Sequence, residues 1–249
     1  MSGSFSERLE TVRARVQAAC ARAGRNADDV RVLPVAKAFG PDAVREAAEA
    51  GVTEIGENRV QEARQKIPLC PGHLRWHMVG HLQRNKVRDA VRLFDMIHSV
   101  DSRRLLETID AACAEEGKKM PVLLEVNVSG ERSKFGMPPE DVPASLDGCG
   151  ALFSLEVRGL MTVPPFAEDS EESRPFFRRL RELRDQWRLG SGLALDELSM
   201  GMSSDFEAAV VEGSTWIRLG TALFGPRAAR VDTGRPRIGG SEELADTEA

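Results

Sequence analysis

A lysine closes an apolar segment near the start of the chain. Lys37 ends the run Val30-Arg-Val-Leu-Pro-Val-Ala-Lys37, whose β-branched residues predict a strand. Apolar walls around its ammonium group would exclude water, and because burial disfavours the charged form, the amine would become a nucleophile toward an aldehyde. The alternative is a lysine that extends from the strand end into solvent, and its position alone does not decide between the two.

Two later segments are rich in glycine and hydroxyl groups, namely Ser199-Met-Gly-Met-Ser-Ser-Asp205 and Leu219-Gly-Thr221. Glycines allow the backbone to approach an anion closely, and serine and threonine add hydroxyl donors. The residues expected to do this are Gly201, Gly220, Ser203 and Thr221. Ser204 has Glu207 three residues on, the spacing of a helix capping box, which leaves Ser203 free. An amine and a phosphate site together favour an aldehyde that carries a phosphate, and pyridoxal 5′-phosphate (PLP) is the obvious candidate.

The histidines do not predict a metal site. His73, His77 and His81 are spaced by four, which would place metal ligands on one face of a helix. However, Pro71-Gly72 precedes them and residues 75–80 are typical of a strand, in which that common face does not exist. We expect His77 to line the interior of the fold and His81 to lie in a loop near the ligand, with no metal bound.

The elements that must position these residues alternate along almost the whole chain. Strands are expected at residues 30–37, 52–56, 75–80, 95–100, 122–128, 155–163, 197–200 and 215–220. Helices are expected at residues 6–23, 41–50, 58–67, 83–93, from the Asp101-Ser102 cap to 116, and at 140–146, 171–187 and 204–213. Eight strands, each followed by a helix or a helical candidate, in about 250 residues predict an α/β fold: a single (β/α)8 TIM barrel with an extra N-terminal helix.

The barrel prediction also says where the chemistry belongs. In this fold the loops that follow the strands form the ligand-binding mouth, and the singled-out residues lie at strand ends. An open doubly wound sheet is the competing architecture, but G-x-G-x-x-G is absent after the first strand. The barrel is expected to span residues 1–230, and residues 231–249, rich in Gly, Ser and Glu, are expected to be a disordered tail.

Composition limits the other classes of function. Lys and Arg number 34 against 39 Asp and Glu, a formal charge of −5, which is not the overall charge of a nucleic-acid binder. We find no signal-peptide pattern and no apolar run long enough to span a membrane, so a cytoplasmic protein is expected. The 4 cysteines form no C-x-x-C pair, which disfavours a disulfide framework. A monomer is expected.

The most basic stretch, residues 174–188, could indicate an RNA or protein partner. Its apolar residues fall on one helical stripe: Phe176, Phe177, Leu180, Leu183 and Trp187. An outer barrel helix with a solvated charged face is therefore the favoured interpretation.

Seven segments resemble the YggS/PROSC family of PLP homeostasis proteins. They are Val35-Ala-Lys-Ala38, Gly56-Glu-Asn-Arg-Val-Gln-Glu62, Trp76-His-Met-Val-Gly-His-Leu-Gln-Arg-Asn-Lys86, Val126-Asn-Val-Ser-Gly130, Gly159-Leu-Met-Thr162, Leu198-Ser-Met-Gly-Met-Ser-Ser-Asp-Phe-Glu-Ala208 and Arg218-Leu-Gly-Thr-Ala-Leu-Phe-Gly225. The resemblance covers roughly residues 9–227. It implies a barrel like the N-terminal domain of alanine racemase, with PLP held as a Schiff base on Lys37.

The same resemblance assigns the other site residues. It implies phosphate contacts at Ser203, Gly220 and Thr221, with Asn58 near the ring and Arg218 facing the pyridine nitrogen. Met200 and His81 are further candidate cofactor-binding residues. Family members often carry Ser-Lys-Thr-Lys after the first strand, whereas this chain has Ala36-Lys-Ala-Phe39 and lacks the second lysine.

Catalytic turnover is not expected. Racemases of related fold need two acid/base groups, one of them a tyrosine from a further C-terminal domain, whereas this chain has 0 tyrosines and ends soon after Gly220. An arginine facing the ring nitrogen would also disfavour its protonation and weaken the electron sink. We therefore expect a PLP carrier or buffer that acts in PLP homeostasis and delivers the cofactor to PLP-dependent apo-enzymes. A PLP-dependent racemase or lyase with His81 as its base is the alternative.

Overall fold

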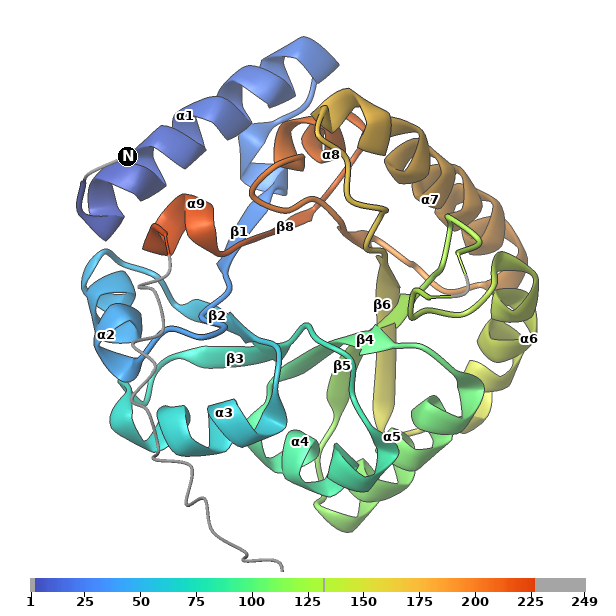
Figure 1. Ribbon diagram of the computed structural model, residues 1–249. Helices are drawn as coiled ribbons and strands as arrows, with labels where there is room; N and C mark the ends of the chain where they lie inside the picture. The colour runs from blue at the N-terminus through green and yellow to red at the C-terminus, as the bar shows by residue number, and fades with distance from the viewer. Residues whose placement is uncertain (1–2, 132, 227–249) are drawn as a thin grey trace, which may run out of the picture.

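The strands form an eight-stranded parallel barrel in the computed structural model, which describes residues 3–131 and 133–226. The strands are β1 (Arg31–Pro34), β2 (Glu54–Glu57), β3 (Arg75–Met78), β4 (Met96–Val100), β5 (Met120–Glu125), β6 (Leu155–Met161), β7 (Glu197–Ser199) and β8 (Trp216–Leu219). Their order in the sheet is β1-β8-β7-β6-β5-β4-β3-β2. A parallel bridge between Val35 and Gly56 joins β1 to β2 and nearly completes the ring (Figure 1). The predicted TIM barrel is confirmed.

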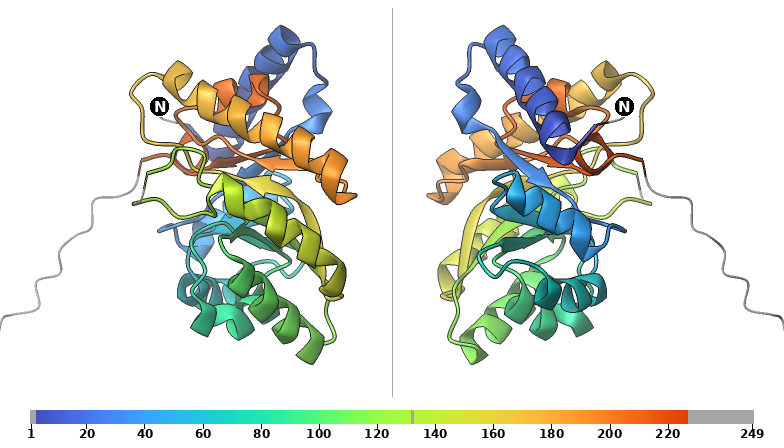
Figure 2. Two further views of the ribbon diagram at one scale, coloured as in Figure 1. Left: turned by 90° about the vertical axis from the view of Figure 1, so that its right-hand side faces the viewer. Right: turned by 90° about the vertical axis from the view of Figure 1, so that its left-hand side faces the viewer.

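Helices surround the strands (Figure 1). They are α1 (Phe5–Ala23), α2 (Pro41–Glu49), α3 (Val60–Lys66), α4 (Val87–Leu93), α5 (Arg103–Glu115), α6 (Val142–Asp147), α7 (Ser170–Ser191), α8 (Phe206–Val211) and α9 (Thr221–Phe224). The extra N-terminal helix is α1, drawn in dark blue along the outside of the barrel in Figure 2. It begins with a capping box between Ser4 and Glu7 and ends at Gly24, which has φ +63°.

Strand alternation divides the core into two parts. Side chains two residues apart along a strand share a face. Outward-facing residues pack beneath the helices, and the inward-facing apolar cluster consists of Leu33, Val79, Met96, Leu123, Met161 and Trp216. Several polar side chains share this interior; His77, for example, is 1% exposed and lies edge-on to the Trp216 ring. The prediction that His77 lines the barrel is confirmed.

The structure corrects the predicted start of the helix after β7. Ser204 and Glu207 do not form a capping box, because α8 begins only at Phe206. Asp205 instead accepts the Met202 N–H through Oδ1 at 2.6 Å, which closes the preceding turn. Glu207 instead pairs with Arg15 of α1 at 2.9 Å, so its carboxylate is engaged by a residue distant in sequence.

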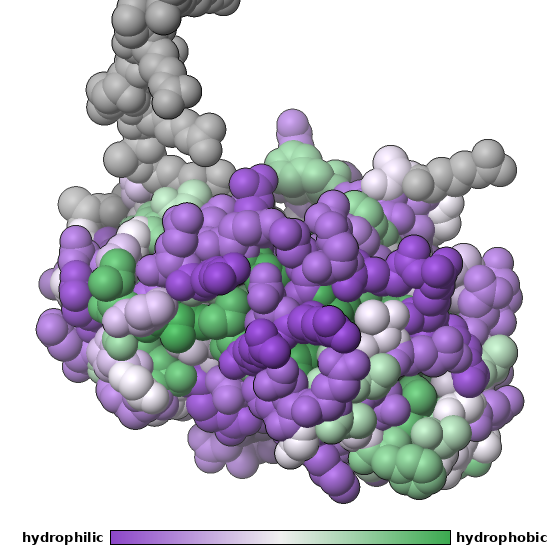
Figure 3. Space-filling view, turned by 90° about the horizontal axis from the view of Figure 1, so that it is seen from below, coloured by the Kyte–Doolittle hydropathy of each residue, from purple (hydrophilic) through white to green (hydrophobic). Residues whose placement is uncertain are grey.

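The basic helix α7 packs as the sequence predicts. Phe177, Leu180, Leu183 and Trp187 are buried, while Phe176 is half-buried. Its charged face is less solvated than expected, because three arginines converge on the buried carboxylate of Glu212: Arg174, Arg178 and Arg181. Hydrophilic side chains predominate on the surface below the barrel as Figure 1 is drawn (Figure 3).

Three predictions depend on which residues the structure describes. Within residues 3–131 and 133–226, no helix is long and apolar enough to cross a membrane. Over the same residues, no group of three or more His, Cys, Asp or Glu side chains could hold a metal ion. The tail predicted at residues 231–249 lies outside the described residues.

Candidate functional site

One pocket of about 610 Å³ lies at the carboxyl ends of β1, β2 and β8. It is lined by all six of the main predicted site residues: Lys37, Asn58, Ser203, Arg218, Gly220 and Thr221. Its remaining lining residues are mostly apolar: Val35, Phe39, Val79, Val163, Phe166, Met202 and Ser204. The strand ends therefore bring a primary amine, a guanidinium and several hydroxyls to one cavity, as the barrel fold predicts.

Lys37 lies in a turn beyond the end of β1. The turn closes through the Phe39 N–H, which donates to the Ala36 carbonyl at 3.0 Å, and Ala38 takes the unusual φ of +64°. Lys37 is exposed, so the expectation that apolar walls exclude water from its ammonium group is wrong. The structure instead agrees with the alternative interpretation, in which Lys37 extends from the strand end into solvent. Its side chain still lines the pocket and is accessible to a ligand.

A buried ion pair supports this turn from below. The Lys66 ammonium contacts the Glu57 carboxylate and donates to the Ala36 carbonyl at 2.8 Å. Glu57 is 0% exposed, and its other oxygen accepts the Asn58 N–H at 2.7 Å. One pair therefore holds the backbone next to both Lys37 and Asn58. The sequence analysis missed it, since the partners meet only when α3 packs against β2.

The predicted phosphate end is formed by two loops. Ser203 accepts the Ala222 N–H through Oγ at 3.2 Å, which ties the loop after β7 to the first turn of α9, directly after β8. A Cβ added at Gly220 would have only the Val35 carbonyl oxygen nearby, at 3.6 Å, so the glycine leaves open space at the pocket wall. Gly201 differs from the expectation. Its φ is +94° and an added Cβ would lie 2.6 Å from Ala209, so this glycine serves the turn and its packing.

Arg218 forms the buried cationic part of the site. It is 5% exposed, and its guanidinium donates to Ser199 Oγ at 2.7 Å and to the Thr162 carbonyl at 2.9 Å. Burial lowers the pKa of Arg218 to about 10, while nearby Glu125 and Asp205 oppose that shift. The guanidinium therefore remains charged at neutral pH.

The two further candidates lie elsewhere. Met200 is 0% exposed in the core between strand and helix, and Met202, two residues further on, lines the pocket in its place. His81 lines a neighbouring pocket of about 570 Å³ together with Lys37 and Asn58. Its Nδ1 lies 3.0 Å from Asp101, and its ring stacks on Phe135 with centroids 3.9 Å apart.

Glu125, at the end of β5, is a titratable residue that the sequence analysis missed. It is 5% exposed, and its Oε2 has no hydrogen-bond partner among the described residues. Burial, together with the nearby charge of Asp101, raises the pKa of Glu125 to about 7, although Arg218 opposes this. Strand alternation carried a signal for it, because Leu123 faces the interior and Glu125 is two residues further on.

Comparisons with known proteins agree with this geometry. Residues 8–228 match the family described as "Alanine racemase, N-terminal domain", which is the class of barrel that the fold and site define. The "Pyridoxal phosphate homeostasis protein" of Aquifex aeolicus is 43% identical over 222 residues, covering 89% of this chain and 97% of that protein. Its namesake from Pseudomonas aeruginosa is 42% identical over 225 residues, covering 90% and 96%. The chain belongs to the family of PLP homeostasis proteins.

Solved structures agree as well. PipY of Synechococcus elongatus PCC7942, in a structure with PLP bound, superposes with a TM-score of 0.80 at 38% identity, covering 89% of this chain and 100% of that one. A D-threonine aldolase from Filomicrobium marinum is only 17% identical, with a TM-score of 0.71, and shows the barrel fold alone. The family and the fold predicted from the sequence are confirmed.

Proposed function

We propose that this chain binds PLP as a Schiff base on Lys37 and acts in PLP homeostasis as a carrier that does not turn over substrate. The observation that carries the proposal is the shared pocket, in which Lys37, Arg218, Ser203 and Thr221 all take part. Relatives at 43% and 42% identity are named PLP homeostasis proteins, and PipY is described with PLP bound. These similarities support the same ligand here.

The residues present fit the cofactor. A volume of about 610 Å³ lies within the range of pockets for small ligands. Lys37 would supply the amine that condenses with the aldehyde, with loss of one water. Ser203 and Thr221 supply hydroxyl donors for a phosphate, and Gly220 leaves room for it. Val35 and Val79 offer apolar contact to a ring.

Arg218 favours binding over turnover. When bound, PLP supplies an electron sink whose strength depends on protonation of its ring nitrogen. Arg218 keeps its own proton at neutral pH because its pKa is about 10. A cation that donates a hydrogen bond toward the ring nitrogen would keep that nitrogen unprotonated. The chain also has 0 tyrosines, the residue that racemases of this fold use as a second base.

A PLP-dependent racemase or lyase is the second candidate. The observation that favours it is Glu125, a buried carboxyl with a pKa of about 7 near Arg218, since a group of that pKa can take up and release protons at neutral pH. Incubating the PLP-loaded protein with L- and D-amino acids decides between the two. Sustained racemisation or cleavage would favour the enzyme, and none is expected from a carrier.

The covalent site has a direct test. The protein is mixed with PLP, reduced with borohydride, digested and mapped by mass spectrometry. The phosphopyridoxyl group is expected on Lys37 and is expected to be absent from Lys37→Arg. Labelling of Lys134, which lies in the loop after β5, would move the site. We further propose a cytoplasmic monomer that delivers PLP to apo-enzymes, which size-exclusion chromatography and transfer assays to a PLP-free aminotransferase would test.

A further inference from the structure

A row of polar side chains crosses the barrel interior between its two ends. It begins at Arg218, which lines the pocket at the carboxyl ends of β1, β2 and β8. The Arg218 guanidinium donates to Ser199 Oγ at 2.7 Å. Ser199 Oγ lies 2.9 Å from His98 Nδ1, and His98 Nε2 lies 3.0 Å from His77 Nδ1. His77 Nε2 lies 3.6 Å from Glu54 Oε1, at the opposite end of the barrel. The strands β8, β7, β4, β3 and β2 each supply one member.

The arginine end favours one direction for these hydrogen bonds. Arginine has only donors, so Ser199 Oγ must accept from Arg218. Among the described residues, Ser199 Oγ has one other polar contact, His98 Nδ1, so the buried hydroxyl proton is satisfied only when it points toward this nitrogen, which then accepts it. A neutral imidazole with an accepting Nδ1 carries its proton on Nε2, so His98 donates to His77 Nδ1. Burial lowers the pKa of His98 well below its usual value, which keeps this ring neutral.

The glutamate end favours the same direction. The His77 side chain holds the pKa of Glu54 below its usual value against the effect of burial, so Glu54 is ionised and can only accept. His77 therefore carries its proton on Nε2, because reversing the direction of the hydrogen bonds would turn a lone pair of Nε2 toward the Glu54 carboxylate. His77 Nε2 is buried and has no partner within 3.5 Å among the described residues, which leaves Glu54 as the group that it faces.

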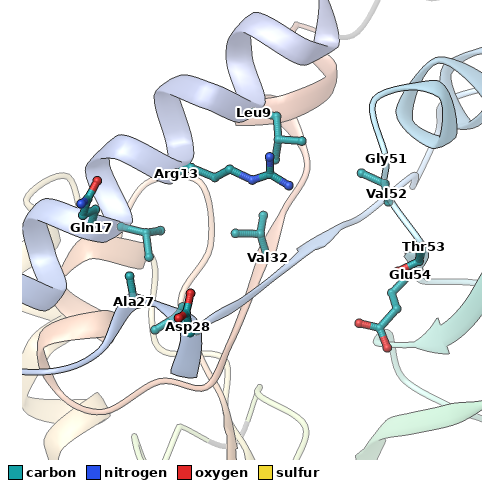
Figure 4. Close-up of a pocket in the computed structure, with 12 residues that line it drawn as sticks. Leu9, Arg13, Gln17, Ala27, Asp28, Val32, Gly51, Val52, Thr53 and Glu54 are labelled. Atoms are coloured by element: carbon teal, nitrogen blue, oxygen red, sulfur yellow. The ribbon is translucent and has the colours of Figure 1, made fainter.

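Glu54 is accessible from outside the barrel. It lines a third pocket, of about 540 Å³, between α1, β1 and β2, with Leu9 and Arg13 on the helix side (Figure 4). Its carboxylate is 24% exposed, and Arg75 lies 3.9 Å away. The other charges at this end of the interior are paired with each other, because Arg31 and Glu197 form a salt bridge at 2.8 Å.

We infer that Glu54, acting through His77, His98 and Ser199, positions the Arg218 guanidinium on the floor of the PLP pocket. These four are positioning residues: the row of hydrogen bonds orders two histidine tautomers and holds the Ser199 hydroxyl proton toward His98, so that both lone pairs of Ser199 Oγ remain available to Arg218. The inference rests on the proposed function, because the position of Arg218 matters to PLP only if PLP occupies this pocket.

The direction of the hydrogen bonds in this row is tested on the protein without PLP. The 4 histidines are labelled with ¹⁵N, and His73→Gln and His81→Gln assign the two exposed ones. Long-range ¹H–¹⁵N correlation at neutral pH is expected to show His77 and His98 both protonated on Nε2. In Glu54→Leu, His77 is expected to show a mixture of tautomers. A wild-type His77 protonated on Nδ1 would overturn the inference, whatever the protein binds.

The consequence for the ligand is tested with three serine variants. Ser199→Ala is expected to raise the Kd for PLP by at least about tenfold, the effect of losing one hydrogen bond to a charged group. Ser199→Thr keeps the hydroxyl and is expected to restore binding. Ser145→Ala is the matched control, because it removes a buried hydroxyl from α6. Unchanged affinity in Ser199→Ala would overturn the inference, whereas a wild type that binds no PLP would refute the proposed function and leave the tautomer test decisive.

Discussion

The Lys66 ammonium and the Glu57 carboxylate form an ion pair directly beneath the turn that carries Lys37, and both side chains are buried, at 7% and 0% exposed. Each partner also forms a hydrogen bond with the backbone. Lys66 donates to the Ala36 carbonyl at 2.8 Å, and Glu57 accepts the Asn58 N–H at 2.7 Å. The pair therefore links the fold of the barrel rim to the position of two residues that line the candidate PLP pocket.

Breaking this pair from one side is expected to be costly. Lys66→Met leaves the charge of the Glu57 carboxylate buried without a cation, and we expect the free energy of unfolding to fall by about 3–5 kcal/mol. The double variant Glu57→Gln with Lys66→Met removes both charges and keeps an oxygen for the Asn58 N–H, so we expect it to recover most of that loss. Urea unfolding monitored by circular dichroism measures both.

The exposed pair of Arg92 and Glu116 provides the control. Their side chains are 60% and 34% exposed, and Arg92→Met is expected to cost less than about 1 kcal/mol. If the double variant were as unstable as Lys66→Met alone, the buried charge of Glu57 would not be the cause of the loss.

Glu125 is expected to make the protein less stable as pH rises. Its pKa is raised from 4.5 to about 7, so between these values the folded chain holds a proton that the unfolded chain releases. Stability therefore falls over this pH window and stays lower above it. Glutamine does not titrate, so Glu125→Gln loses no stability over this window. Its free energy of unfolding is expected to exceed that of wild type by about 3 kcal/mol above the window and to match it below the window.

Denaturant titrations across this pH range measure the difference between Glu125→Gln and wild type. A difference that shrinks as pH rises would show instead that Arg218 stabilises an ionised Glu125. The same series on the protein loaded with PLP would show whether the bound ligand changes the titration.

Glu212 is expected to behave with the opposite sign. Burial opposes its ionisation, but the arginines Arg178 and Arg174 outweigh burial and hold the pKa of Glu212 below its usual value. Its contribution is therefore present above the unfolded pKa and is lost as pH falls. Glu212→Gln is expected to destabilise the fold at neutral pH by about 1–3 kcal/mol and to have little effect in acid. Thermal melts at several pH values measure this, and an effect independent of pH would contradict it.

The order of the elements could be predicted from the sequence because each strand and helix carries its own periodicity. The ends of elements could not, since distant contacts decide them. Ala36 N–H donates to the Gly56 carbonyl at 2.9 Å, beyond the last residue of β1 at Pro34, and the chain then turns at Lys37 and Ala38. The pairing of Glu207 with Arg15 likewise follows from α1 packing on α8.

The lining of the pocket could be predicted because all strands of a parallel barrel end on one rim. The environment of each lining residue could not. Lys37 belongs to the pocket but is exposed, which depends on the turn at Ala38. The pair of Glu57 and Lys66 could not be predicted either, because no sequence rule says that the lysine of α3 reaches back under β1.

Two glycines of the pocket region give a matched test of the phosphate site. Gly220 has a negative φ of −99°, and an added Cβ meets only the Val35 carbonyl oxygen at 3.6 Å, so Gly220→Ala is expected to change the free energy of unfolding by less than about 1 kcal/mol. The new methyl group would project into open space at the pocket wall, where a phosphate must approach the backbone. The Kd for PLP is therefore expected to rise at least about tenfold.

Gly201→Ala is expected to do the reverse. The φ of +94° and the approach of Ala209 to 2.6 Å oppose any Cβ at position 201, so the free energy of unfolding without ligand is expected to fall by about 1–3 kcal/mol. Urea unfolding and titration with PLP or inorganic phosphate separate the two effects. Unchanged PLP binding in Gly220→Ala would show that the phosphate lies elsewhere, because a methyl group at position 220 cannot share space with an anion held against that backbone.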